Sequence, residues 1–340
     1  MATTASTSIG ILGTGSYVPK QEVSNEEVAE RVRAADPWMT PEWIERKTRI
    51  RSRRYAAPDE ATSDLAAHAG ADALQHAGLR PEDIDFLLVS TSTPDHPQPP
   101  TAHLVQHQLG AYEAACMDLN VVCSGFVYAL AVARSLVAQK PGSHALVIAA
   151  EVYSRFIDVT DRRTAVLMAD GAGAAVVGPT DDGYGFVDFE LAGRGDAHGL
   201  IRIDAGGSRV PPSARTVAEG GHFVKMEGRG VRDFVLENLP PALEKLAGRT
   251  GVPLSAVHHF VPHQPNGVML QEIVDACGLG GARTHRTLDT YGNVGSASVA
   301  LTLDDAHRAG HLAPGDVVLL GGFGGGMAIG AGLLRWAVTA

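Results

Sequence analysis

The sequence has few of the features that mark secreted, membrane-spanning or nucleic-acid-binding proteins. Only three cysteines occur, and they form no C-x-x-C pair, so we expect neither a disulfide framework nor a zinc ribbon, and a cytoplasmic location. Polar residues interrupt the apolar stretches, and residues 1–9 lack the basic start and apolar run of a signal peptide. The formal net charge is −10 with no long basic run, so nucleic acid and anionic membrane are not expected partners.

What the chain does have is enough apolar sequence for a large core. Hydrophobic residues make up 45% and charged residues 19% of its 340 residues. Short apolar runs alternate with longer helical patterns, which predicts an α/β protein with mostly covered sheets. We expect strands at 9–12, 86–90, 145–149, 174–177, 260–262 and 317–320, and helices at 63–77, 124–138, 229–247 and 294–309.

A long internal repeat predicts two similar halves. The pattern of a helix end, a Gly/Pro turn and a buried strand occurs at residues 78–90 and again at 251–263. Helices that begin at Cys123 and Asn293 both end in a Pro-Gly pair before another strand, and each half is expected to close with a glycine-rich hairpin, at 170–173 and 324–326. We place the halves at 1–178 and 179–340. Chance similarity between two αβ units is the alternative.

Three residues are candidates for covalent chemistry. Cys123 follows an apolar segment and precedes a small-residue helix start, where the helix dipole and free N–H groups favour a thiolate. His263 follows a buried strand, and Asn293 occupies in the second half the position that Cys123 holds in the first. Taken singly, each has an ordinary structural explanation: a buried thiol, a core histidine and a helix N-cap.

A metal site is not expected in this sequence. His258, His259 and His263 are close in sequence, but adjacent strand positions face opposite ways, and no carboxylate or cysteine stands at ligand spacing.

Eight short motifs, in order along nearly the whole chain, resemble β-ketoacyl-acyl-carrier-protein synthase III and its relatives among the thiolase-fold condensing enzymes. The resemblance implies a thiolase fold with five layers, α-β-α-β-α, and a homodimer. The motifs occupy residues 41–44, 122–126, 160–162, 170–175, 226–228, 262–266, 291–293 and 322–326.

The resemblance also implies a role for each site residue. Cys123 would take an acyl group from coenzyme A, with the backbone N–H groups of Cys123 and Gly325 as the oxyanion hole. His263 and Asn293 would hold the thioester carbonyl of a malonyl acceptor while it loses CO₂. Coenzyme A thioesters would be substrates, with no separate cofactor and no metal. The implied substrate-binding residues are Trp43 and Arg162, which would sandwich the adenine, Lys47, Gly228, Asn266, which would orient the site, and Phe323, which would shield the cysteine.

Three departures from the family pattern affect substrate delivery. Lys47-Thr48-Arg49 stands where relatives often have Arg-Thr-Gly, which alters the nucleotide grip. The stretch 268–276 lacks the basic residues that often meet an acyl carrier protein, so such a partner is left open, and Pro97-Gln98-Pro99-Pro100 leaves the primer size open.

Three functions compete at this stage. The first is decarboxylative condensation that starts a fatty acid, polyketide or other secondary metabolite. The second is an acyltransferase that passes the acyl group from Cys123 to an alcohol, amine or carrier thiol without decarboxylation. The third is a catalytically silent subunit, against which the complete set of Cys123, His263 and Asn293 argues.

Overall fold

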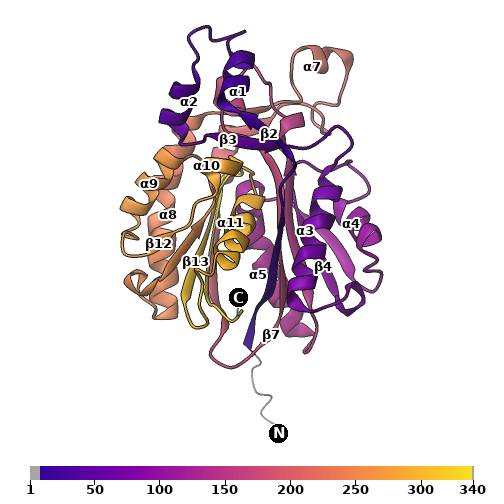
Figure 1. The fold of residues 1–340 in the computed structure, drawn as a ribbon, viewed down its shortest axis with the longest axis vertical. Coiled ribbons are helices and arrows are strands. Elements are labelled where there is room, and N and C mark those ends of the chain that lie inside the picture. Colours follow the sequence, from indigo (N-terminus) through magenta and orange to yellow (C-terminus); the bar gives the residue numbers. More distant parts are fainter. Residues whose placement is uncertain (1–7, 339–340) are drawn as a thin grey trace.

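Two five-stranded sheets and the helices around them make up the protein, seen here in a computed structural model that describes residues 8–338 (Figure 1). The helices are α1 (Asn25–Val32), α2 (Pro41–Thr48), α3 (Thr62–Ala77), α4 (Thr101–Leu109), α5 (Gly125–Gln139), α6 (Arg162–Ala165), α7 (Ala214–Ala218), α8 (Gly228–Thr250), α9 (Gly267–Ala276), α10 (Leu288–Tyr291) and α11 (Ala297–Arg308). The strands are β1 (Ser8–Tyr17), β2 (Gln21–Ser24), β3 (Ser52–Tyr55), β4 (Phe86–Ser90), β5 (Ala115–Leu119), β6 (Ala145–Val152), β7 (Asp170–Thr180), β8 (Gly185–Gly193), β9 (Ile201–Ile203), β10 (Val224–Met226), β11 (His259–Pro262), β12 (Arg283–Thr284), β13 (Val317–Gly324) and β14 (Ala328–Arg335).

The two sheets repeat one topology. The first has the order β1-β7-β6-β4-β5 and the second, read from its other edge, β8-β14-β13-β11-β12. In both, the central pair (β4 with β6, β11 with β13) is parallel, and the next strand joins antiparallel. The predicted repeat is therefore confirmed, with β4 matching β11 and β6 matching β13. The chain passes from the first sheet to the second at residues 181–184, so the proposed boundary at 178/179 falls within the last residues of β7.

Helices form three layers around the two sheets, which confirms the predicted order α-β-α-β-α. Helix α3 covers one face of the first sheet, and α8 and α9 cover the outer face of the second, while α5 and α11 contact strands of both sheets and lie between them (Figure 1). A helix covered on both faces must be apolar nearly all round. By length and composition, the segment Val122–Gln139 could cross a membrane, although the sequence pattern did not predict a membrane-spanning helix. Half of this segment is buried inside the protein.

The structure corrects two details of the predicted elements. Residues 170–173 begin strand β7 and pair with β1 and β6, so they form no hairpin turn, whereas 324–326 do connect β13 to β14. Helix α11 begins at Ala297, four residues after Asn293, so Asn293 does not start the helix. The glycines at 170–173 suggested a turn, but small residues are also required where a strand passes close to a central helix. A Cβ on Gly173 would lie 2.6 Å from Ala300 of α11.

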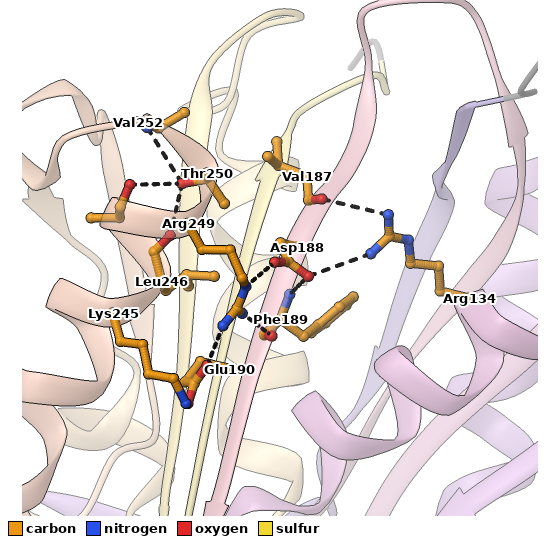
Figure 2. A network of polar contacts seen from close by, with 11 residues as sticks. Arg134, Val187, Asp188, Phe189, Glu190, Lys245, Leu246, Arg249, Thr250 and Val252 are labelled. Atoms are coloured by element: carbon orange, nitrogen blue, oxygen red, sulfur yellow. Dashed lines mark hydrogen bonds and ion pairs between the residues drawn. The ribbon is translucent and has the colours of Figure 1, made fainter.

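An ion-pair network fastens α8 to the edge strand β8 (Figure 2). The Arg249 guanidinium donates to Asp188 at 2.5 Å, to Glu190 at 2.6 Å and to the Phe189 carbonyl oxygen at 2.6 Å. Lys245 also bonds Glu190, whose side chain is only 7% exposed. Because planar guanidinium geometry matches several acceptors at once, this arrangement fixes the helix on the sheet better than scattered surface pairs would.

Arg49 ends helix α2 in a conformation that normally selects glycine. Its φ is +63° and its ψ +10°, in the left-handed region, and its N–H donates to the Glu45 carbonyl at 2.7 Å. A residue with a Cβ costs roughly 1–2 kcal/mol there. The side chain lies against the start of α9, since a Cβ built on Gly267 would come within 2.5 Å of the Arg49 Cβ.

We predict that Arg49→Gly stabilises the protein by about 1 kcal/mol, because glycine removes the left-handed penalty. Urea unfolding would measure it. The matched control is Arg46→Gly, one turn earlier on the exposed side of α2, where glycine should cost about 1 kcal/mol. A loss of stability in Arg49→Gly would show that contacts of its side chain outweigh the backbone cost.

Candidate active site

One cavity of about 770 Å³ gathers residues from both halves of the chain. All of the residues proposed from the sequence line it except Gly325, which adjoins it: Trp43, Lys47, Cys123, Arg162, Gly228, His263, Asn266, Asn293 and Phe323. Of its lining residues, Lys47 on α2 and Gly228 at the start of α8 are exposed and mark its entrance, whereas Cys123, His263 and Asn293 are buried and form its floor. The structure thus brings the candidates together.

Cys123 lies on a short 3₁₀ turn, Val122–Ser124, immediately before α5. Val122 has a φ of +45°, a conformation that a β-branched residue rarely adopts, and such strain concentrates at functional sites. The opposite wall must be glycine: a Cβ on Gly324 would lie 2.9 Å from the Cys123 sulfur. Cys123 is only 4% exposed, so its thiol meets the cavity and little else.

Burial opposes the thiolate that the helix start favours at Cys123. Desolvation of the thiol, followed by the charge of the Glu151 carboxyl, raises the pKa of Cys123 to about 12. The backbone N–H groups of Gly325 and of Cys123 itself act in the other direction, which places both donors at the sulfur. These are the two groups that the oxyanion-hole hypothesis named, but desolvation outweighs them.

His263 is the neutral partner in the same cavity. It follows β11, and its backbone N–H donates to the Gly321 carbonyl oxygen at 2.6 Å. The ring meets Phe323 edge to face, with centroids 5.4 Å apart, and the residue is 2% exposed. Burial lowers the pKa of His263 to about 3, while the nearby Gly295 carbonyl raises it slightly. A neutral imidazole keeps one N–H and can donate a hydrogen bond without carrying charge.

Asn293 is held by bonds that cross from one half to the other. Its backbone N–H donates to the Leu167 carbonyl oxygen, and its carbonyl oxygen accepts from the Ala169 N–H, both at 2.9 Å. Its side-chain Oδ1 accepts from the Gly295 N–H at 3.0 Å, and Nδ2 donates to the Pro265 carbonyl oxygen at 3.4 Å. Nδ2 carries two N–H groups and gives one to Pro265, so Asn293 keeps a second N–H that it can offer to a ligand.

The other histidines near His263 have separate partners. His259 lies 3.0 Å from His285 and 3.0 Å from Asp316, and His258 accepts a bond from the Val317 N–H at 2.8 Å. Neither is among the residues that line the cavity.

Trp43 and Arg162 line the entrance, and Trp38 packs against both. The Arg162 guanidinium carbon lies 6.0 Å from the centre of the Trp43 ring and 5.5 Å from that of Trp38, and Trp38 meets Trp43 edge to face at 5.2 Å. An intercalated adenine needs about 7 Å between its neighbours, two van der Waals contacts. The predicted sandwich of adenine between Trp43 and Arg162 thus requires Arg162 to move outward, away from its ion pair with Asp36 at 3.1 Å.

The remaining substrate-binding candidates contribute shape and capping. Gly228 begins α8, and a Cβ there would meet open space. The Asn266 side chain accepts from the Met269 N–H at 2.8 Å, so it caps α9 in addition to lining the cavity. Phe323 is 1% exposed and supports His263.

Sequence reasoning missed Trp38 and Glu151. Trp38 is 51% exposed beside the entrance, and its signal was a large aromatic ring in a proline-flanked segment before α2. Glu151 lies at the end of the central strand β6, fully buried, where the sequence shows one carboxylate in an otherwise apolar run. A charge inside such a run needs partners or a function.

We predict that alkylation of Cys123 by iodoacetamide in the folded protein increases about tenfold per pH unit from about pH 7 to pH 10, without a plateau, because a thiol of pKa about 12 is still titrating. Peptide mass spectrometry would follow Cys123. In the urea-unfolded control the pKa returns to about 8.5 and the rate should level off. A plateau below about pH 9 in the folded protein would contradict the buried-thiol assignment.

The chain is similar to known proteins of one family over nearly its whole length. The family model 3-Oxoacyl-[acyl-carrier-protein (ACP)] synthase III matches residues 117–195, and its C-terminal counterpart matches residues 248–336. The acetoacetyl CoA synthase NphT7 of Streptomyces sp. (strain CL190) is 50% identical over 96% of this chain and 98% of its own. The β-ketoacyl-[acyl-carrier-protein] synthase III of Caldanaerobacter subterraneus is 40% identical over 96% and 97%. The crystal structure of the priming β-ketosynthase from the R1128 polyketide biosynthetic pathway superposes with a TM-score of 0.89 at 35% identity, covering 98% of both chains. The chain belongs to the 3-oxoacyl-[acyl-carrier-protein] synthase III family of thiolase-fold condensing enzymes.

Proposed function

We propose that this protein transfers an acyl group from acyl-CoA to Cys123 and then condenses it with a malonyl thioester, with loss of CO₂. The observation that carries the proposal is the cavity that holds Cys123, His263 and Asn293 together, with two backbone N–H groups at the sulfur and uncharged donors opposite. Membership of a condensing-enzyme family supports it.

The first half-reaction forms the acyl-enzyme. The Cys123 sulfur attacks the thioester carbonyl of acyl-CoA, and the carbonyl oxygen takes up negative charge beside the N–H groups of Cys123 and Gly325. Collapse expels coenzyme A, which leaves as the thiol with the proton that Cys123 gives up. Since both Cys123 and His263 are neutral at rest, the thiol must lose its proton as the new C–S bond forms.

The second half-reaction forms the carbon–carbon bond. The malonyl carboxylate leaves as CO₂, and its electron pair becomes an enolate on the thioester oxygen. His263 and Asn293 donate hydrogen bonds to that oxygen. Because the pKa of His263 is about 3, its ring is neutral and forms no ion pair with the departing carboxylate. The enolate carbon attacks acyl-Cys123, the 3-oxoacyl thioester leaves, and the Cys123 thiolate takes a proton. Its raised pKa favours that last step at neutral pH.

For the acceptor we propose malonyl-CoA in preference to a malonyl carrier protein. Helix α9, beside the cavity mouth, carries no lysine or arginine, and of its two carboxylates Glu272 is paired with Arg232 at 2.7 Å. Carrier proteins are acidic, and an interface for them needs opposite charge, which α9 does not supply. The relative named acetoacetyl CoA synthase supports the same acceptor. We also propose a cytoplasmic location and, within the acyltransferases, a reaction of the β-ketoacyl-acyl-carrier-protein synthase III type.

We predict that Cys123→Ala abolishes acylation, whereas Asn293→Ala keeps acylation and loses about 10²–10³ in CO₂ release, because it removes one donor to the enolate oxygen. Intact mass spectrometry after incubation with a panel of acyl-CoAs measures acylation, and carboxyl-labelled malonyl-CoA measures decarboxylation. His263→Ala should behave like Asn293→Ala, with an added acylation loss if His263 accepts the Cys123 proton.

Three outcomes would overturn parts of this proposal. A stable acyl mass on Cys123→Ala would remove the nucleophile, and undiminished CO₂ release in Asn293→Ala would remove the enolate donor. If the wild type releases no CO₂ but passes its acyl group to an alcohol, amine or carrier thiol, the acyltransferase reading replaces condensation. Malonyl carrier protein outcompeting malonyl-CoA would reverse the proposed acceptor.

We further propose a homodimer built across strand β5. This strand is the edge of the first sheet, and its Met117 and Leu119 are only partly buried. An unpaired edge with apolar side chains is a ready pairing surface, and β5 leads directly to Cys123.

We predict that light scattering at micromolar concentration gives about 71 kDa, twice the 35.6 kDa of the chain. Met117→Lys should shift the mass toward the monomer, because a charge in a paired apolar strand is costly, while Val268→Lys, at an exposed apolar position of α9 in the other half, should not. A monomer mass for the wild type would end the proposal.

A further inference from the structure

Glu151 is a fully buried carboxylate near Cys123, and hydroxyl and amide donors surround it. It accepts from Ser296 Oγ at 2.7 Å, from Thr93 Oγ1 at 2.8 Å, from Ser92 Oγ at 3.0 Å and from the Ser92 N–H at 3.1 Å. The residue is 0% exposed and has no cation among these partners. A buried carboxylate without a counter-ion costs folding free energy, so its retention calls for a reason beyond packing.

The donors come from two different places in the chain. Ser92 and Thr93 follow β4 in the first half, whereas Ser296 lies in the second half, between Asn293 and α11. Ser296 Oγ also lies 3.3 Å from the Ser90 carbonyl oxygen. Glu151 therefore joins the turn at residues 293–296 to the floor built by the first half.

That same turn carries two of the proposed site groups. The Gly295 N–H holds Asn293 Oδ1 at 3.0 Å, and the Gly295 carbonyl acts on the His263 ring. Gly295 has a φ of +53°, and a Cβ there would lie 2.4 Å from the Tyr153 ring and 3.2 Å from Glu151 Cγ. The turn thus lies directly on Glu151 and Tyr153, and a shift of Ser296 would carry Gly295, and with it Asn293 and His263.

We propose that Glu151 is a positioning residue: through Ser296 it sets where the 293–296 turn places the Asn293 and His263 donors for the condensation half-reaction. The inference rests on the proposed function. It assigns Glu151 no contact with substrate. The acylation half-reaction relies on the N–H groups of Cys123 and Gly325, which do not belong to this turn, so the two half-reactions should respond differently.

The test is a double-mutant cycle on the Glu151–Ser296 contact. Glu151→Gln keeps the shape but gives up one acceptor oxygen, and Ser296→Ala removes the donor. Each should lower CO₂ release about ten- to a hundredfold, the cost of a small misplacement. The acyl-enzyme burst should change less than about threefold in Ser296→Ala, and in Glu151→Gln it should not fall, because loss of the carboxyl lowers the pKa of Cys123. The double variant should be no slower than the worse single variant, because both remove one contact.

Thr93→Val is the matched control. It removes another donor to the same carboxylate but leaves the 293–296 turn untouched, so it should alter stability without separating the half-reactions. Hydrogen exchange of the peptide spanning residues 290–297 gives a readout that does not depend on activity: it should speed up in Glu151→Gln and Ser296→Ala and not in Thr93→Val.

The outcomes separate the two claims. If the wild type releases no CO₂, the proposed function is wrong, and the hydrogen-exchange data then decide whether Glu151 holds the 293–296 turn in place. If wild type condenses, any of three results shows that the positioning role is wrong. Both half-reactions could fall together in Glu151→Gln, the losses in CO₂ release of the two single variants could multiply in the double variant, or hydrogen exchange at 290–297 could stay unchanged. Should Glu151→Gln fail to fold, Ser296→Ala, which removes one hydroxyl, carries the same test.

Discussion

The site exists only because the two halves of the chain bind each other at one central seam. Asn293 pairs with Leu167 and Ala169 across it, and Ser296 reaches Glu151. Further out, Asp304 of α11 accepts from Thr14 at 2.8 Å and from Ser16 at 2.6 Å, both on β1. Cys123 comes from one half and His263 and Asn293 from the other, so anything that opens the seam separates the nucleophile from its donors.

Burial at this seam decides the chemistry as well as the geometry. Removing water raises the pKa of Cys123 and lowers that of His263, so both are uncharged at neutral pH. A thiolate at Cys123 would occupy the N–H groups of Cys123 and Gly325. A neutral pair leaves the donors free for the oxygen on which charge develops, in a cavity where water does not screen them.

The sequence predicted the architecture well because periodicity and repeat record what the core requires. The strands at 86–90 and 317–320 and the helix at 63–77 appear within a few residues of expectation, and the resemblance located the cavity-lining residues. Prediction from the sequence failed where the tertiary environment of a residue overrides the chemistry of its local segment. A helix start suggests a thiolate at Cys123, but only the three-dimensional structure shows how completely the thiol is desolvated. Glu151 could not be interpreted, because its partners lie 58 to 145 residues away along the chain.

Two of the three departures from the family pattern, at 47–49 and at 268–276, lie together where α2 meets the start of α9. Arg49 takes a left-handed position that suits glycine and covers the start of α9, next to an α9 that bears only acidic charges. Selection for stability alone would restore glycine at that position. Under the proposed function, a side chain held there against a backbone cost is explained by what passes the entrance, because the floor needs only a thioester, whereas the entrance recognises its carrier. Changing the entrance while keeping Cys123, His263 and Asn293 would then alter which carrier delivers the thioester and leave the reaction the same.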